Sequence, residues 1–251
     1  LVVDMGAWFN YGCPTSKIAK PEVKGTIYRV RNTRAPAVAD GWGKSLKLDS
    51  MPPSQLVGLL ADSRPKVRER AADRLVKLGR PAVASLANIG RDTSARTLRS
   101  SATSAVTLPG SKDLTAENAE GRRDIGQAHH RREAVLVLSR IGTPEARRAV
   151  RQALGDADSS VRLVAAHCCG LERDAGSLDA LGKIVVSDEP PVRLKAAEAI
   201  GRLRDPAGVT AVLASIRRGG GDRFLEHALI YALLRINHRD ATLAALDDSN
   251  P

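Results

Sequence analysis

One histidine and two adjacent cysteines, His167, Cys168 and Cys169, fall within the segment SSVRLVAAHCCG at residues 159–170. Imidazole and thiolate groups bind zinc, and paired thiols carry redox chemistry. The remaining cysteine is Cys13, and no C-x-x-C spacing occurs in the chain. Adjacent cysteines rarely close a disulfide, and a structural zinc ion needs four ligands. The cysteines therefore indicate neither a zinc ribbon, nor a disulfide framework, nor a haem attachment site.

Three other segments contain residue types that could do chemistry. His129-His130 and Glu226-His227 are adjacent pairs, and neighbouring residues on a helix point about 100° apart, which suits no shared ligand. We expect a solvated turn for the first pair and helix packing or a helix hydrogen bond for His227. The glycines of RRGGGDR (217–223) follow no strand and match no phosphate-binding loop. With no Ser-His-Asp order and no G-x-S-x-G, the sequence predicts no catalytic, cofactor-binding or metal-binding residue and no enzyme activity in this segment.

A repeat accounts for the surroundings of these residues. His130, Val161, Val192 and Phe224 recur at intervals of 31, 31 and 32 residues, and Val67 lies 63 residues before His130, close to two periods. Alanine pairs follow the valines four and five residues later, and an apolar residue follows at the eighth position. The structural positions predicted from this pattern are Asp62, Val67, Arg68, Ala71, Ala72, Asp156, Val161, Arg162, Ala165, Ala166, Val192, Arg193, Ala196 and Ala197.

The repeat predicts stacked helix pairs. Further helical patterns lie between the repeated ones, and Thr143, Asp174 and Asp205 are placed to cap them. Neither helix of a pair buries its apolar face alone, and paired alanines let neighbouring helices approach closely. Cys169 occupies the apolar eighth position, so we expect a small buried side chain, whereas His167 falls on the polar side.

Aspartate and arginine also keep a repeated spacing. Asp62 precedes Arg68 by six residues, as Asp156 precedes Arg162, and Asp188 precedes Arg193 by five. An acid in the turn within one helix pair and an arginine at a helix start could pair across repeats as a ladder. Exposed pairs of this kind contribute about 0–1 kcal/mol each, so they would set register more than stability.

Composition supports a helical fold and leaves the partner open. The 251 residues are 43% hydrophobic but only 3% aromatic, which favours closely packed helices over a sandwich or barrel. The net charge of +11 comes from basic residues spread along the chain. An arginine-rich solvated surface and an anionic partner both fit this charge. No apolar run approaches the eighteen residues that a membrane span needs.

Composition shifts suggest three regions. Residues 1–31 contain two strand-like runs, LVVDMGAWF and GTIYRV, which cannot bury a core alone and are interpreted as the end of a sheet domain. Residues 32–54 are rich in proline and glycine and are predicted to be a linker, and residues 55–251 are predicted to be helical. Residues 92–127 lack an apolar face for a partner helix, and both a polar insertion and a degenerate repeat remain open.

These residues resemble a known family. The pattern D-x-x-P-x-V-R-x-R-A-A-x-x-L-x-x-L-G (62–79) and the units at 156–171 and 188–203 are similar to HEAT repeats of the PBS-lyase-like kind. Residues 12–31, 42–75 and 221–236 resemble the PVC-type membrane-bound dehydrogenase family, in which a sugar-dehydrogenase-like β-propeller precedes HEAT repeats and often a cytochrome c domain. The resemblance implies an all-α, right-handed α–α solenoid of about five to six HEAT-like repeats, preceded by a two-strand remnant of a truncated propeller.

The resemblance also implies function. The family's redox residues lie outside this segment, so no cofactor is expected here, and the family implies an extracytoplasmic location. The favoured hypothesis is a non-catalytic scaffold that binds a protein partner or the adjacent domains of a larger oxidoreductase-like protein. The alternatives are a basic solenoid that binds nucleic acid and a PBS-lyase-like module that handles a chromophore or a partner protein.

Overall fold

The computed structural model describes residues 2–4, 26–28, 38–89, 116–219 and 222–245. The chain divides into two units, residues 1–39 and residues 40–251, and each is described by itself. In the first unit, strands β1 (Val2–Asp4) and β2 (Thr26–Tyr28) pair antiparallel with Val3 opposite Ile27. Both strand-like runs therefore contain a strand, and their assignment to a propeller stays a prediction.

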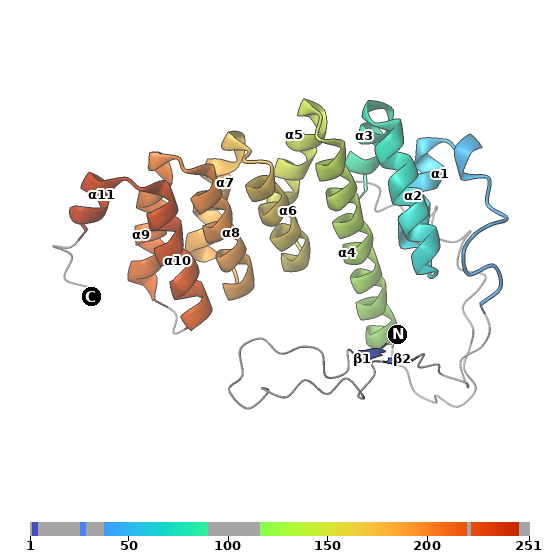
Figure 1. The fold of residues 1–251 in the computed structure, drawn as a ribbon, viewed down its shortest axis with the longest axis horizontal. Coiled ribbons are helices and arrows are strands. Elements are labelled where there is room, and N and C mark those ends of the chain that lie inside the picture. Colours follow the sequence, from blue (N-terminus) through green and yellow to red (C-terminus); the bar gives the residue numbers. More distant parts are fainter. Residues whose placement is uncertain (1, 5–25, 29–37, 90–115, 220–221, 246–251) are drawn as a thin grey trace. The chain divides into compact units, whose positions relative to one another are not determined.

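The second unit is a helical solenoid. Figure 1 shows its helices following one another in a row from α1 to α11. Five helix pairs form the described part of this unit, and α11 follows them. Their bounds are α1 (Pro53–Gly58), α2 (Pro65–Leu78), α3 (Arg80–Ala87), α4 (Ala116–Ile141), α5 (Pro144–Gln152), α6 (Ser159–Leu171), α7 (Leu178–Ser187), α8 (Pro190–Leu203), α9 (Val209–Arg218), α10 (Arg223–Ile236) and α11 (Arg239–Leu243).

The second helix of each pair forms a continuous layer. These second helices are α2, α4, α6, α8 and α10, and each packs against the next, while α1 packs on α3, α3 on α5 and α7 on α9. One hydrophobic cluster runs through all five pairs, from Leu48 to Ile236. Most of the predicted alanines and valines lie inside it: Ala71, Val161, Ala165, Ala166, Ala196 and Ala197 are fully buried members, and Val67 is fully buried as well.

The second helices touch through their backbones. A Cβ added to Gly170 of α6 would lie 2.8 Å from the Cα of Ala199 on α8. One added to Gly201 of α8 would lie 3.0 Å from the Cα of Ala232 on α10. Contacts this short leave no room for a side chain, because protein interiors are packed as densely as organic crystals.

Two of the three predicted capping residues, Thr143 and Asp205, form side-chain hydrogen bonds at helix starts, and Asp174 does not. The Thr143 hydroxyl accepts a hydrogen bond from the Ala146 backbone N–H at the start of α5, and the Asp205 carboxylate accepts one from Ala207. Asp174 was expected to cap in the same way and does not. Its two carboxylate oxygens instead accept hydrogen bonds from Arg151 at 2.7 and 2.6 Å, because a charged donor is the stronger partner.

The sequence distance between α2 and α4 is about two repeats, but in space the two helices are direct neighbours. Val67 and His130 are separated by about two periods in sequence, yet α2 packs directly on α4. Within the described residues no helix pair lies between them, and the intervening chain joins α3 to α4. Residues 116–127 of the predicted insertion or degenerate repeat belong to helix α4, and residues 92–115 lie outside the described residues. The choice between those two interpretations stays open.

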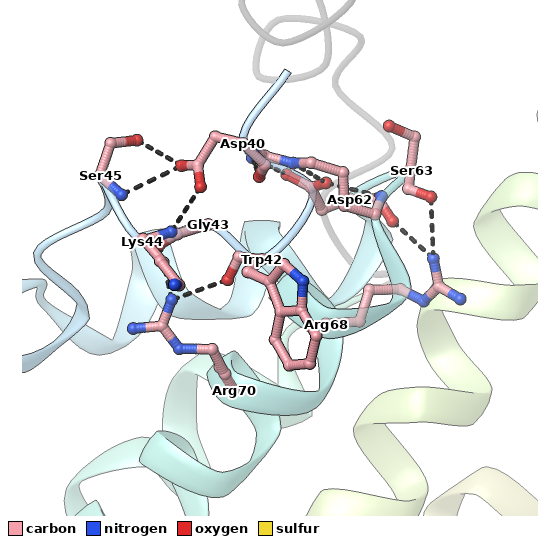
Figure 2. Close-up of polar contacts among 10 residues, drawn as sticks. Asp40, Trp42, Gly43, Lys44, Ser45, Asp62, Ser63, Arg68 and Arg70 are labelled. Carbon is pink, nitrogen blue, oxygen red and sulfur yellow. Dashed lines mark hydrogen bonds and ion pairs between the residues drawn. The ribbon is translucent and has the colours of Figure 1, made fainter. Parts of the chain in front are cut away.

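At the N-terminal end of the helical unit, the segment 40–50 is held against α2 by polar contacts (Figure 2). The Asp40 carboxylate accepts hydrogen bonds from the Lys44 and Ser45 backbone N–H groups at 2.7 and 3.0 Å. Arg70 on α2 donates to the carbonyl oxygens of Trp42 and Gly43 at 2.9 and 2.6 Å. Gly43 has φ +63°, and a Cβ there would lie 2.6 Å from Val67. Part of the predicted linker 32–54 is thus packed on α2, while residues 32–37 lie outside the described residues.

Gly170→Ala is expected to lower the free energy of unfolding by about 1–3 kcal/mol, because the added methyl group must push α6 and α8 apart. The measurement is chemical denaturation followed by circular dichroism. Gly58→Ala is the matched control, since nothing lies within 4 Å of a Cβ at this helical glycine. That control should be neutral or stabilising by up to about 1 kcal/mol. A Gly170→Ala protein as stable as the unaltered chain would contradict the role of backbone contact.

Candidate functional site

The cysteines on α6 are packing residues. Cys169 is 1% exposed, and burial raises the pKa of its thiol to about 12. Cys168 is equally buried, and burial raises its thiol pKa although Ser139 hydrogen-bonds to it. A thiol that resists ionisation is a poor nucleophile and a poor metal ligand. The expected burial of Cys169 is confirmed, and Cys13 lies outside the described residues. In the part of the chain that the structure describes, no group of three His, Cys, Asp or Glu residues is placed to hold a metal ion.

The adjacent histidines on α4 behave differently from each other. A solvated turn was expected for both, and this is wrong because both lie within helix α4 and are half-buried. His130 differs most from the expectation. Its ring is half-buried, and its Nε2 lies 2.8 Å from the Val57 carbonyl oxygen at the end of α1. Burial is the main cause that lowers the His130 pKa, so the ring is neutral and donates to this carbonyl. His129 lies 4.0 Å from Glu133 on the same helix.

The remaining candidate segments are His227 on α10 and the glycines that follow α9. The His227 ring stacks on Tyr231 with centroids 6.4 Å apart, one turn along α10. Gly219 ends helix α9 with φ +67°, and Gly220 and Gly221 lie outside the described residues.

The predicted ladder between repeats is present in the middle of the solenoid. Arg131 on α4 donates two hydrogen bonds to Asp156 in the next repeat, at 2.8 and 2.9 Å. Arg162 on α6, one period later, donates to Asp188 at 2.7 and 2.6 Å. These bonds from Arg162 are the main cause that lowers the Asp188 pKa. The ladder joins consecutive turns, so it holds each pair in register with the next.

The arginines of the ladder also donate to backbone carbonyls, and Arg162 reaches the Asp156 carbonyl oxygen at 2.9 Å. Arg68 donates to the Asp62 carbonyl oxygen at 2.8 Å, while the Asp62 carboxylate pairs with Arg64. Arg193 is 5% exposed and donates to the Val185 carbonyl at 2.9 Å and to the Ser215 hydroxyl, also at 2.9 Å. Burial lowers the Arg193 pKa. The sequence spacing alone did not distinguish carboxylate from carbonyl partners.

A groove of about 480 Å³ opens on the exposed side of the second helices. We call it the α2–α4–α6 groove. Its lining residues are Pro65, Arg68, Glu69 and Ala72 from α2, then Glu133, Leu136, Val137, Ser139 and Arg140 from α4, and His167, Cys168 and Leu171 from α6. Leu136 is 39% exposed and Leu171 is 56% exposed, so two large apolar side chains face solvent here.

The charges around the groove largely neutralise one another. Glu69 pairs with Lys66 at 2.6 Å, and Arg140 pairs with Asp73 at 2.8 Å. His167 is half-buried, and its pKa is lowered first by burial and then by the nearby Lys195 and Arg202. Its Nδ1 is buried and has no hydrogen-bond partner. The groove therefore has apolar walls, a rim of both charge signs and one unused polar atom, an arrangement that suits a protein segment.

Of the residues that line this groove, sequence reasoning singled out only Arg68, Ala72, His167 and Cys168, and it did not predict a groove. His167 was placed on the polar side of its helix, where the structure puts it at the groove. Leu136 and Leu171 lie outside the repeated pattern and were missed. The available signal was a leucine at a helix position where the apolar stripe predicts a polar residue.

Acidification should destabilise the chain partly through His130. The lowered His130 pKa means that the unfolded chain, with an ordinary histidine near 6.5, binds the proton first as pH falls. Stability is therefore lost as pH drops below about 6.5. His130→Gln keeps a donor for Val57 without a titrating group, so its melting temperature should fall less between pH 7 and pH 5.

The pH series needs one control and has one decisive outcome. His227→Gln replaces an exposed histidine of α10 and should keep the pH profile of the unaltered chain. If His130→Gln showed the same loss of melting temperature as the unaltered chain, the buried imidazole would not be a source of acid sensitivity.

Among the described residues, no helix is both long and apolar enough to cross a bilayer. A search of curated proteins found no match. A search of solved structures matched human deoxyhypusine hydroxylase in complex with glycerol, at 20% identity over 74% of each chain. Its TM-score of 0.40 is too low to carry an argument about this chain. The family model for HEAT repeats matches residues 126–193 and 151–234. Residues 126–234 of the helical solenoid therefore match HEAT repeats.

Proposed function

We propose that this chain is a non-catalytic scaffold that binds a protein segment in the α2–α4–α6 groove. The observation that carries the proposal is the groove itself, because three successive second helices line it with two exposed leucines. HEAT repeats form a helical repeat scaffold, and repeats of this kind often mediate protein interactions.

The chemistry of the groove favours a peptide over a small metabolite. Leu136 and Leu171 supply apolar contact, and each square ångström of apolar surface removed from water contributes roughly 25 cal/mol. Glu133 lines the groove on α4, and Arg140 on the same helix is already paired with Asp73. A segment with one or two apolar side chains between charged residues would complement the two leucines and Glu133. The raised thiol pKa values of Cys168 and Cys169 support a packing role for them rather than catalysis.

The partner is proposed to be an adjacent domain of the same parent protein. The resemblance of residues 12–31, 42–75 and 221–236 to the PVC-type membrane-bound dehydrogenase family motivates this step. In that reading residues 1–31 end a β-propeller, the parent is oxidoreductase-like and the protein is extracytoplasmic. The solenoid would then hold the propeller beside its partner or electron acceptor.

Nucleic-acid binding has less support. Phosphate contacts need free arginine and lysine heads. Several arginines of the described residues are instead committed to carboxylates, including Arg131, Arg151 and Arg162. No described contact favours a chromophore-handling role over a scaffold.

The test of the scaffold uses the double variant Leu136→Glu/Leu171→Glu. Titration calorimetry would measure binding of the full chain to the other domains of its parent, expressed as a separate polypeptide. The variant is expected to weaken binding at least tenfold, equivalent to about 1.4 kcal/mol, since two carboxylates would be desolvated on binding.

The matched control is Leu243→Glu, which changes an exposed leucine on α11, away from the groove. It should bind as the unaltered chain does. No binding by the unaltered chain, or equal binding by the groove variant, would overturn the proposal. Stoichiometric visible absorbance of a bound redox cofactor would also overturn it.

A further inference from the structure

The last second helix, α10, exposes four large apolar side chains, more than any other described second helix. Phe224 is 76% exposed, Ile230 57%, Tyr231 49% and Leu234 70%. With His227, which stacks on Tyr231, they form what we call the α10 patch. Their spacings of three, four and seven residues place them on one side of the helix. Exposed apolar side chains gathered in this way mark an interaction site more often than scattered ones do.

Only part of the patch departs from the repeat. Phe224 and Tyr231 occupy the positions of Val192 and Ala199, which are buried on α8, whereas His227, Ile230 and Leu234 differ from α8 in character. The positions of α8 that lie 32 residues before His227, Ile230 and Leu234 are Lys195, Glu198 and Arg202. At the corresponding place α8 is polar, and Lys195 pairs with Glu198 at 2.9 Å. Packing within the solenoid does not require leucine and isoleucine at these positions, because α8 stacks in the same layer without them.

Positive charge stands at both ends of the patch. Arg223 begins α10, and Arg235 lies in its last turn with the guanidinium 5.8 Å from the centre of the Tyr231 ring. Two α10 helices from two copies of the chain, packed antiparallel through the patch, would bring Arg223 of one against Arg235 of the other. Parallel packing would bring like residues together. Either arrangement opposes like charges, so a second copy is a poor occupant.

An anionic membrane is a poor occupant as well. Glu226 lies exposed between the two arginines on the same helix. Headgroup phosphates would repel its carboxylate. A partner helix can carry acidic side chains only at the positions that face Arg223 and Arg235, and none opposite Glu226.

We infer that the α10 patch binds an amphipathic helix of a partner protein, with apolar side chains over Ile230, Tyr231 and Leu234 and carboxylates that reach Arg223 and Arg235. Helix-on-helix packing is the way in which this layer already extends from α2 to α10. Apolar residues at helical spacing supply the affinity, and the arginines at both ends select the acidic partner. The inference rests on the proposed scaffold role and adds a second surface with a defined partner chemistry.

The experiment titrates the full chain into fluorescent synthetic helical peptides and follows anisotropy. Three peptides share one length: one with leucines on one face and glutamates at both ends, one with lysines in place of those glutamates, and one acidic peptide with serines for leucines. The acidic leucine peptide is expected to bind at least tenfold more tightly than either of the others.

The variant Ile230→Glu/Leu234→Arg gives α10 the residues that α8 has at these positions. Both side chains are exposed, so the fold should be kept, and circular dichroism and thermal melting check this. Binding of the acidic peptide should weaken at least tenfold. The groove variant Leu136→Glu/Leu171→Glu is the control and should bind this peptide as the unaltered chain does.

Several outcomes would overturn the inference. They are equal binding of acidic and lysine peptides, no binding of the acidic peptide, and unchanged binding by the folded patch variant. Patch-dependent binding only to phosphatidylserine vesicles, or only to a second copy in sedimentation experiments, would also overturn it. Because the groove is tested separately with the parent's domains, failure at the α10 patch leaves the scaffold proposal standing, and failure at the groove is seen independently.

Discussion

Backbone contact between the second helices is the constraint on which this solenoid depends. Gly170 meets Ala199, and Gly201 meets Ala232, at distances that exclude any side chain between them. Helices that approach this closely leave little volume to fill, so aliphatic side chains from alanine to leucine fill the core without aromatic rings. This explains how a chain with 3% aromatic residues builds one continuous hydrophobic cluster through five described helix pairs.

Close stacking of the repeats also determines which charged side chains form ion pairs. Consecutive turns come near enough for Arg131 to reach Asp156 and for Arg162 to reach Asp188, both one repeat ahead. These pairs are only partly exposed, so they resist screening better than surface pairs do. Arg193 is more deeply buried and satisfies its donors on Val185 and Ser215 instead. Much of the basic character of the chain is therefore used internally, to align repeats.

Both surfaces proposed for partners lie on the exposed side of the second helices. The α2–α4–α6 groove and the α10 patch both lie on helices of this layer, yet they differ in chemistry. The groove has two leucines inside a rim of paired charges, whereas the patch has an aromatic and aliphatic surface between two arginines. A scaffold with two such surfaces can hold two segments at a fixed separation, because the shared core makes the described solenoid one packed body.

The period of valine and paired alanine determined the fold class, the buried positions and the burial of Cys169, because helical spacing and small side chains act locally. The sequence also indicated an aspartate–arginine ladder. It did not determine that α2 packs directly on α4, that His130 reaches Val57, or that Arg193 bonds to main-chain carbonyls. It did not indicate that Leu136 and Leu171 share a groove. Each of these joins residues from different helices, and only the tertiary packing decides which side chains then meet.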